Sequence, residues 1–525
     1  MMVLSGLKRG ILLLTAAGLA AIPAVALAQV PGPDTLVLAG GTDASTLDPD
    51  DITSRDTANI AQHIWGSLLQ ISDSGKIEPY FAQSYSESAD GKTLTFKLHP
   101  GLTCHDGEPL TAEDVVYTFK RAKDPDLKFT GSTPGFVFES LGYKDARVVD
   151  ELTAEIIIDK YNPIAFGMIS EVLLMCKDSY SKMTKEQAAQ KPIGSGPYKF
   201  VEWVKSDRIV LEKNPNFKLH PVNFDKVIWR VIPEATTRTA ELLAGNVDII
   251  TNVAPDQIPT VNKSAKAKVA AVSGTRRMYI GFNQKDVFAN VPGGKEIRDP
   301  KVRRALQYAV DVPAICEQLL NTPCKRATGL VNAPNDNPDL QPYPYDPKMA
   351  EKLLDEAGYP RKNGVRFEIT MQAPRGRYLN DANVALAVGQ YLTDVGVKTK
   401  VDLMEWASVY VPLTRKKEAG PLFFLGSGGG TWNALYDMAD LSTPNAGTNY
   451  TNWDDPEFFD GWADFATKKP VEEQRKTINR MLKVFYDKGP WLLMYFQPDF
   501  YGVSNRIAWS PRRDERIYIN DAKLK

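Results

Sequence analysis

Two hydrophobic periods alternate along the chain. Residues 93–98 alternate polar and apolar side chains, which is typical of a half-buried strand, and residues 35–38 form a second short apolar stretch. Thr111 is a favourable N-cap residue followed by two acidic residues, and the apolar positions after it recur at helical spacing. The first third of the chain therefore predicts strands interrupted by helices.

The same alternation continues through the rest of the chain. Predicted helices span residues 236–245, 302–309, 347–357 and 381–395, and predicted strands span residues 247–250 and 397–403. Gly245 marks one helix end, because glycine readily adopts the left-handed conformation found after many helices. Strands joined through helices predict an α/β fold with mainly parallel strand pairing.

The N-terminus has the pattern of an export signal. Lys8 and Arg9 precede an apolar stretch over residues 11–22, and an Ala-Leu-Ala sequence ends at Ala28. The stretch is shorter than a membrane span, so we expect cleavage after Ala28 and a protein free in the periplasm. Because the first cysteine is Cys104, we expect no lipid anchor.

Composition excludes several classes of partner. The 525 residues are 43% hydrophobic and 24% charged, which is ordinary for a globular protein of several lobes. The 63 basic and 64 acidic residues leave a net charge of −1, so neither nucleic acid nor an anionic membrane surface is an expected partner.

An exported chain can form disulfides. A local Cys316–Cys324 bridge is one option, and Cys104 and Cys176 either pair or stay as buried thiols.

No catalytic or metal-binding motif is present in the sequence. No serine has glycine at both −2 and +2, as a nucleophile elbow requires, and the cysteine spacings do not fit a zinc site. The glycine-rich segment 426–430 lacks the Lys-Ser/Thr ending of a phosphate-binding loop. We therefore predict a protein that is not an enzyme and holds neither a cofactor nor a metal. An exported hydrolase and a chaperone-like interaction protein are the alternatives.

Several motifs occur in one order over nearly the whole chain. They include Thr-Leu-Asp-Pro at 46–49, a strand–turn–helix stretch over 89–116 and Ile-Gly-Ser-Gly-Pro-Tyr at 193–198, followed by segments at 303–311, 345–360 and 452–458. In this combination the chain resembles the family 5 extracellular solute-binding proteins, which bind dipeptides, oligopeptides or nickel for ABC importers. The resemblance implies a receptor that hands a small polar ligand to the permease subunits and works as a monomer.

The resemblance also implies a type II periplasmic-binding fold, in which two lobes joined by a two-strand hinge close on the ligand. The expected hinge strands lie near Arg276–Asn283 and Leu492–Tyr501. Domain I would comprise residues 29–71, an inserted extra lobe at 72–190, residues 191–274 and the tail 493–525, with domain II at 275–492 and the signal peptide at 1–28. The four histidines all precede residue 221, which disfavours the nickel-binding branch.

Aromatic residues gather around the glycine-rich segment, which we expect to be a loop close to the ligand or, alternatively, a structural turn. Aromatic side chains can cover the apolar faces of a ligand, although core packing is the alternative. Arginine binds carboxylates through two parallel hydrogen bonds, and the peptide-binding relatives place such an arginine in the loop that holds Arg375 and Arg377 here. An exposed, solubilising arginine is the alternative. The candidate ligand-binding residues are Arg375, Arg377, Gly430, Trp432, Tyr436, Tyr450 and Tyr495.

One departure from the family pattern concerns the ligand. Peptide-binding relatives place an aspartate after a Gly-Trp segment to hold the ligand ammonium, and that position falls on Gly430 here. Asp437 and Asp440 lie further on and would substitute only if the loop is rearranged. We therefore expect simple free-amine peptides to bind weakly, whereas opine-like conjugates, sugar-containing compounds and modified peptides become credible ligands.

Overall fold

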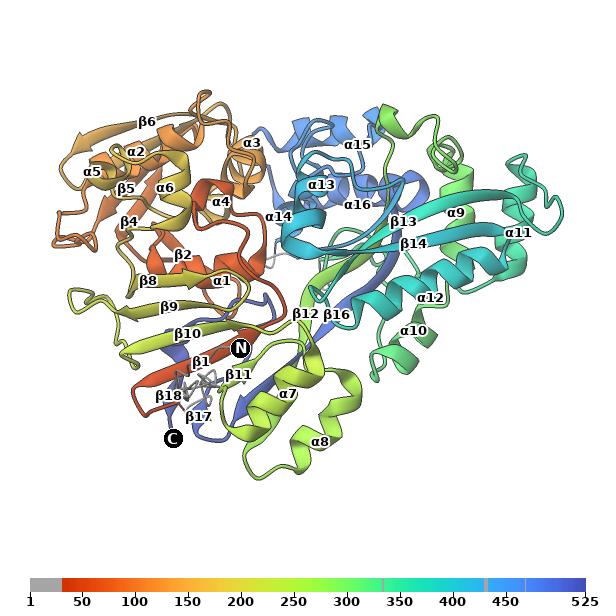
Figure 1. Ribbon diagram of the computed structural model, residues 1–525. Helices are drawn as coiled ribbons and strands as arrows, with labels where there is room; N and C mark the ends of the chain where they lie inside the picture. Colours follow the sequence, from red (N-terminus) through yellow and green to blue (C-terminus); the bar gives the residue numbers. More distant parts are fainter. Residues whose placement is uncertain (1–30, 333–334, 429–432, 468) are drawn as a thin grey trace, which may run out of the picture.

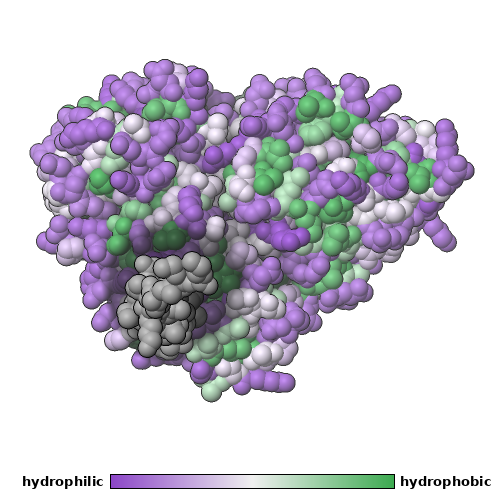
Figure 2. Space-filling model, viewed as in Figure 1, coloured by the Kyte–Doolittle hydropathy of each residue, from purple (hydrophilic) through white to green (hydrophobic). Residues whose placement is uncertain are grey.

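The computed structural model describes residues 31–332, 335–428, 433–467 and 469–525 (Figure 1). The expected signal peptide lies outside the described residues. Two candidate ligand-binding residues, Gly430 and Trp432, also lie outside them. Within these ranges no helix is long and apolar enough to cross a membrane. Figure 2 shows a largely hydrophilic face on which hydrophobic residues form small scattered groups.

A ten-stranded sheet runs through the whole molecule (Figure 1). Its strand order is β14 (Val397–Glu405), β13 (Phe367–Arg375), β15 (Leu422–Gly428), β12 (Ala267–Phe282), β16 (Trp491–Ser504), β11 (Ile249–Ile250), β1 (Thr35–Gly40), β10 (Lys226–Val231), β9 (Arg208–Lys213) and β8 (Tyr198–Val204).

The two longest strands, β12 and β16, join the two halves of this sheet. They pair antiparallel, and their register shifts between Ser273 and Arg277. Strand β12 pairs with β16 on both sides of this shift. Before the shift, the facing part of β16 also pairs with β11, and after the shift β12 also pairs with β15 on its other edge. We call residues 31–266 with 505–525 the N-terminal lobe and residues 283–490 the C-terminal lobe.

The pairing is mixed, so the expectation of mainly parallel strands is wrong. Four of the nine neighbouring pairs are parallel and five are antiparallel. The physical reason is connectivity: β12 and β16 cross between the lobes in opposite directions, and β8, β9 and β10 form a meander that needs no helical crossover.

The N-terminal lobe carries a second, wholly antiparallel sheet of β4 (Ala82–Glu87), β5 (Thr93–Leu98), β7 (Thr153–Ile158) and β6 (Tyr143–Asp150). Helix α2 (Ala112–Ala122) packs on it and begins with a complete capping box, in which Thr111 and Asp114 bond each other's backbone N–H groups. This sheet lies within the expected inserted lobe.

Most predicted helices form within one or two residues of their expected ends. They are α7 (Ala235–Ala244), α9 (Pro300–Ala309), α11 (Pro347–Glu356) and α12 (Asp381–Asp394). Gly245 caps α7 with φ +92°, the left-handed conformation expected there. The remaining helices are α1 (Arg55–Ile64), α3 (Phe138–Leu141), α4 (Ala165–Ile169), α5 (Lys177–Tyr180), α6 (Lys185–Gln190), α8 (Ile258–Lys263), α10 (Val312–Leu319), α13 (Val411–Arg415), α14 (Ala434–Met438), α15 (Pro456–Phe459) and α16 (Val471–Lys488).

Two short hairpin sheets complete the fold, β2 (Leu69–Ile71) with β3 (Ile77–Pro79) and β17 (Ile507–Ala508) with β18 (Lys523–Leu524). All four cysteines form disulfides, Cys104–Cys176 within the inserted lobe and Cys316–Cys324 after α10. Both pairings are among the alternatives that the sequence left open.

Candidate ligand-binding cleft

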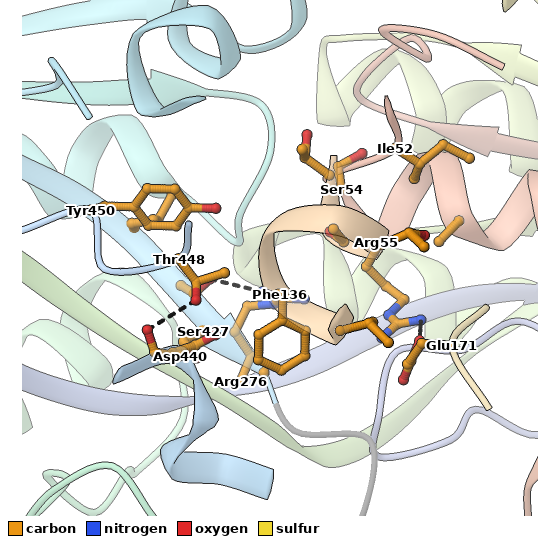
Figure 3. Close-up of a pocket in the computed structure, with 18 of the residues that line it drawn as sticks. Ile52, Ser54, Arg55, Phe136, Glu171, Arg276, Ser427, Asp440, Thr448 and Tyr450 are labelled. Atoms are coloured by element: carbon orange, nitrogen blue, oxygen red, sulfur yellow. Dashed lines mark hydrogen bonds and ion pairs between the residues drawn. The ribbon is translucent and has the colours of Figure 1, made fainter. Parts of the chain in front are cut away.

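A cavity with about 200 Å³ of open space lies between the two lobes, beside the hinge (Figure 3). The N-terminal lobe contributes the start of α1, the segment around Phe136 and the segment around Glu171. Opposite them, the C-terminal lobe contributes the end of β15 and residues between α14 and Tyr450, while β12 supplies Arg276 and Tyr279. A ligand held here would touch both lobes.

The N-terminal wall is built on the first turn of α1. Ser54 caps this helix by accepting a hydrogen bond from the Thr57 N–H, which places Arg55 at the first helical position. The Arg55 side chain is 17% exposed and its Nη1 lies 3.8 Å from Glu171 Oε2. That distance is an ion pair without a hydrogen bond, because N–H···O bonds rarely exceed 3.2 Å.

Glu171 is held firmly by groups from both lobes. Its Oε1 accepts hydrogen bonds from the Tyr436 hydroxyl, at 2.7 Å, and from the Arg516 guanidinium. Burial alone would raise the pKa of the Glu171 carboxyl, but Arg516 and Arg55 outweigh burial and lower it below its ordinary value. Glu171 is therefore an anion whose charge is already balanced.

Strand β12 presents Arg276 to the cavity with each of its three guanidinium nitrogens making one hydrogen bond. Its Nε and Nη2 donate to the two carboxylate oxygens of Glu515, and its Nη1 donates to the Gly426 carbonyl at 3.0 Å. Glycine is needed at 426 because a Cβ there would lie 2.8 Å from Arg276 Cδ and from the Met278 sulfur. The glycine-rich segment is thus the end of strand β15 as far as Gly428, not a free loop, and it leaves space for an arginine.

A short chain of hydrogen bonds leads from behind the sheet to Asp440. Arg277 Nη2 donates to Ser427 Oγ at 2.8 Å, and Ser427 Oγ donates to Asp440 Oδ2. Arg277 also forms an ion pair with the buried Asp437, whose Oδ2 accepts from the Asn332 N–H. Burial raises the pKa of Asp440, and the positive charge of Arg277 opposes that shift. Of these two aspartates, only Asp440 lines the cavity.

The predicted site residues fall into different places. Tyr436 and Tyr450 line the cavity. Arg377 is buried and its guanidinium faces carboxylates of the N-terminal lobe, whereas Arg375 is exposed in a separate groove of about 820 Å³. Tyr495 is fully buried in β16 and does not line the cavity, while Gly430 and Trp432 lie outside the described residues.

Sequence reasoning did not identify Arg55 or Glu171 as cavity residues, and it ranked Asp440 only as a substitute. The Thr-Leu-Asp-Pro motif ends just before Arg55, yet no local pattern separates a cleft arginine from a surface one. Gly430, where the peptide-binding relatives carry their aspartate, lies outside the described residues, and of the two substitutes only Asp440 lines the cavity. Within the described ranges, no group of His, Cys, Asp or Glu is arranged to hold a metal.

Direct contacts between the lobes describe a closed cleft. Tyr436 bonds Glu171 across it, and the Gly447 N–H donates to the Gly135 carbonyl at 3.1 Å. A Cβ on Gly447 would lie 2.6 Å from that carbonyl oxygen, so only glycine permits this approach. Nearer the hinge, Arg377 joins the C-terminal lobe to the N-terminal lobe through Asp56 at 3.4 Å.

A family model described as "Bacterial extracellular solute-binding proteins, family 5 Middle" matches residues 76–449. The chain belongs to this family. Its curated relatives include the glutathione-binding protein GsiB of Pectobacterium atrosepticum, which is 28% identical over 469 residues, covering 87% of this chain and 88% of the relative. The oligopeptide-binding protein AppA of Bacillus subtilis is 25% identical over 487 residues, covering 87% and 86%. Members of the family are binding proteins, periplasmic or extracellular, rather than enzymes.

Solved structures share the fold of this family 5 protein. The periplasmic binding protein DppA of Helicobacter pylori, in complex with the peptide STSA, superimposes with a TM-score of 0.84 at 21% identity, covering 93% of this chain and 98% of that one. The binding protein AgaA of A. tumefaciens R10, in complex with agropinic acid, gives 0.83 at 23% identity, covering 94% and 99%. Both likenesses bear out the expected α/β type II periplasmic-binding fold.

Proposed function

We propose that this protein is the solute receptor of an ABC importer and captures a small peptide-class or opine-like ligand between its lobes. The observation that carries the proposal is the closed cavity beside the hinge, whose walls come from both lobes and contain charges of both signs. A ligand that touches both lobes binds the closed state better than the open one and so shifts the equilibrium towards closure.

The ligand class follows from relatives and from the cavity together. Relatives are named for glutathione and oligopeptides, and structures similar to this one hold a short peptide or agropinic acid. About 200 Å³ of open space favours a compact ligand over an extended peptide. Nickel complexes fit less well, because none of the four histidines lines the cavity.

The proposal includes several finer points. The protein is exported by cleavage after Ala28, works as a monomer in the periplasm and delivers its ligand to the permease subunits of the importer. Tyr436 and Tyr450 contact the ligand in the cleft, with Gly430 and Trp432 in the neighbouring segment. The lobe boundaries lie close to residues 275 and 492, where the hinge strands cross.

Native mass spectrometry of protein purified without denaturation tests the proposal. We expect a co-purified small molecule, and after its removal and re-addition a change of tryptophan emission together with a higher melting temperature. A ligand at one hundred times its dissociation constant stabilises the native state by about 2.7 kcal/mol. A bound compound that changes neither signal at saturation would contradict closure around the ligand.

A further inference from the structure

The two hinge strands are unevenly paired where they cross between the lobes (Figure 1). Ser273 on β12 faces Pro498 on β16 and Arg277 faces Phe496, so three residues of β12 oppose the single residue Gln497. A bulge of this kind bends a strand and redirects its side chains. The bulge therefore marks the part of the hinge where strand pairing constrains the two lobes least.

Asp499 lies beside this bulge and is 3% exposed. Its Oδ1 accepts a hydrogen bond from Gln497 Nε2 at 2.8 Å, whereas its Oδ2 has no partner among the described residues. A Cβ on Gly274 would overlap Oδ2 and lie 2.6 Å from the Gln497 carbonyl oxygen, so glycine leaves the space that the carboxyl fills. A buried carboxyl that receives one hydrogen bond, from a neutral amide, is far more stable protonated than ionised.

The neighbouring arginines are bonded to other carboxylates. Arg276 donates to Glu515, and Arg377 faces Asp56 at 3.4 Å and Glu515 at 3.5 Å. Burial and the charge of Glu515 raise the pKa of Asp499 well above its ordinary value. Burial alone would also raise the pKa of Glu515, but Arg276 and Arg377 outweigh it and lower that pKa to about 2. The titratable and charged groups around Asp499 are Glu515 and Arg513 of the C-terminal tail, Arg276 of β12, Arg377, Tyr501 of β16 and Asp56 of α1.

A loop of the C-terminal lobe holds this arrangement in place. The Leu379 N–H, between β13 and α12, donates to Gln497 Oε1 at 3.1 Å, and Gln497 in turn holds Asp499. Arg377 belongs to the same loop. Opening of the cleft withdraws the loop with its lobe, and water takes its place. Burial acts on Asp499 more strongly than Arg377 does, so hydration favours the ionised carboxyl even though Arg377 leaves.

We infer that Asp499 is a proton-controlled element of the hinge, which holds a proton in the closed protein and releases it to water when the lobes open. The inference rests on the proposed receptor function and names a regulation of its closure. The closed state then binds one proton more than the open state. Its advantage is complete below about pH 4, where the carboxyl is protonated in both states, and fades as the pH rises, by up to about tenfold per pH unit.

Small-angle scattering of the ligand-free protein tests the inference with the proton as the only probe. Between pH 5 and 8 we expect the ratio of open to closed molecules to rise at least about tenfold, which increases the radius of gyration. A radius of gyration that stays constant over this range would overturn the inference.

Two aspartate variants assign the response to the hinge. Asp499→Asn is neutral at every pH and can still accept the hydrogen bond from Gln497, so its open fraction should not depend on pH. Asp50→Asn is the matched control, because burial raises the pKa of Asp50 to about 7 but this residue bonds Arg121 inside the N-terminal lobe. The control should open like the wild-type protein. A pH response that persists in Asp499→Asn would contradict the role of this carboxyl.

A third variant covers the case in which Asp499→Asn does not fold. Gly274→Ala introduces a Cβ that overlaps the position of Asp499 Oδ2. It should displace the carboxyl towards water and open the hinge already at pH 5. If Gly274→Ala is as closed as the wild-type protein at pH 5 and opens to the same extent at pH 8, the bulge does not control closure.

The compound that co-purifies with the native protein separates failure of the inference from failure of the proposed function. If that compound closes the cleft with equal affinity at pH 5 and 8, the proton-controlled hinge is overturned and the receptor function stands. If no compound alters fluorescence or melting, the receptor function fails, and the scattering profile of the ligand-free protein still decides whether Asp499 controls the hinge.

Discussion

Two buried arginines, Arg121 and Arg377, each face two carboxylates, but they occupy different parts of the molecule. Arg121 lies within the N-terminal lobe and binds Asp48 and Asp50, with its Nη2 2.7 Å from Asp48 Oδ2. Arg377 belongs to the C-terminal lobe and faces Asp56 at 3.4 Å and Glu515 at 3.5 Å, both in the N-terminal lobe. Both arginine side chains are 5% exposed.

The ion-pair distances are longer at Arg377 than at Arg121, and we attribute this to the position of Arg377 between the two lobes. The Arg121 pairs need not separate while the lobe is folded, so short bonds and stacking on Phe129, at 4.5 Å, are compatible with function. Because Arg377 and its partners lie on different lobes, we expect these pairs to part when the cleft opens, and one partner, Asp56, is 30% exposed and can regain water. Tight pairing within a lobe therefore stabilises the fold, whereas loose pairing between lobes adjusts the balance between open and closed states.

The largest expected effect comes from breaking the pair within the lobe. Arg121→Met leaves Asp48 and Asp50 buried without a cation and should lower the free energy of unfolding by about 3–5 kcal/mol. Urea unfolding measures this loss. Ligand affinity of the folded fraction should be unchanged, because Arg121 does not line the cavity. A stability loss below about 1 kcal/mol would contradict the distinction between the two clusters.

His63 offers a second test of a group inside the N-terminal lobe. Burial lowers the pKa of His63 to about 4, and its Nε2 bonds the Ile517 carbonyl. The unfolded chain takes up a proton near pH 6.5 whereas the folded chain does not, so stability is complete above pH 6.5 and falls as the pH drops towards 4. Between pH 7.5 and 5 the loss assigned to His63 is about 2 kcal/mol.

The variant His63→Gln removes this titration. Urea unfolding at pH 7.5 and 5 should show a smaller pH dependence for the variant than for the wild-type protein, by about that amount. Ligand affinity at pH 7.5 should not change, because His63 lies in the core of one lobe. An unchanged pH dependence would show that His63 is not held neutral in the fold.

Breaking the pair between the lobes should act on binding more than on folding. Arg377→Met removes the links to Asp56 and Glu515, but Glu515 keeps Arg276 as a partner. We expect about a tenfold loss of ligand affinity, equivalent to about 1.4 kcal/mol, because the closed state loses part of its stabilisation. Calorimetry measures the affinity, and small-angle scattering of the ligand-free protein should show a larger open fraction. A large loss of stability with normal affinity would place Arg377 with Arg121.

The smallest expected effect concerns a single hydroxyl across the cleft. Tyr436→Phe removes the bond to Glu171 and should weaken ligand binding by about 1 kcal/mol, with little change in the free energy of unfolding. Tyr486→Phe is the matched control, because the Tyr486 hydroxyl bonds the Gln341 carbonyl within the C-terminal lobe. Equal affinity losses for both variants would remove the Tyr436–Glu171 bond from the contacts that stabilise closure.

Local sequence signals predicted much of the architecture because their causes are local. Thr111 caps α2 through bonds to residues two and three positions away, and Gly245 ends α7 through its own backbone conformation. The period-two pattern of β5 likewise depends on neighbouring side chains. Family motifs added the two-lobe fold, which solved structures bear out.

The cleft was decided by tertiary structure, because the availability of a charged side chain depends on partners that are distant in the sequence. Arg276 is taken up by Glu515, 239 residues away, and Glu171 by Arg516, 345 residues away. Among the described residues Arg55 has only the longer ion pair with Glu171, at 3.8 Å, although nothing in its local sequence distinguishes it from Arg375. The sequence by itself determined which elements form and which family they build, and the packing of the lobes determined which charged side chains line the cleft.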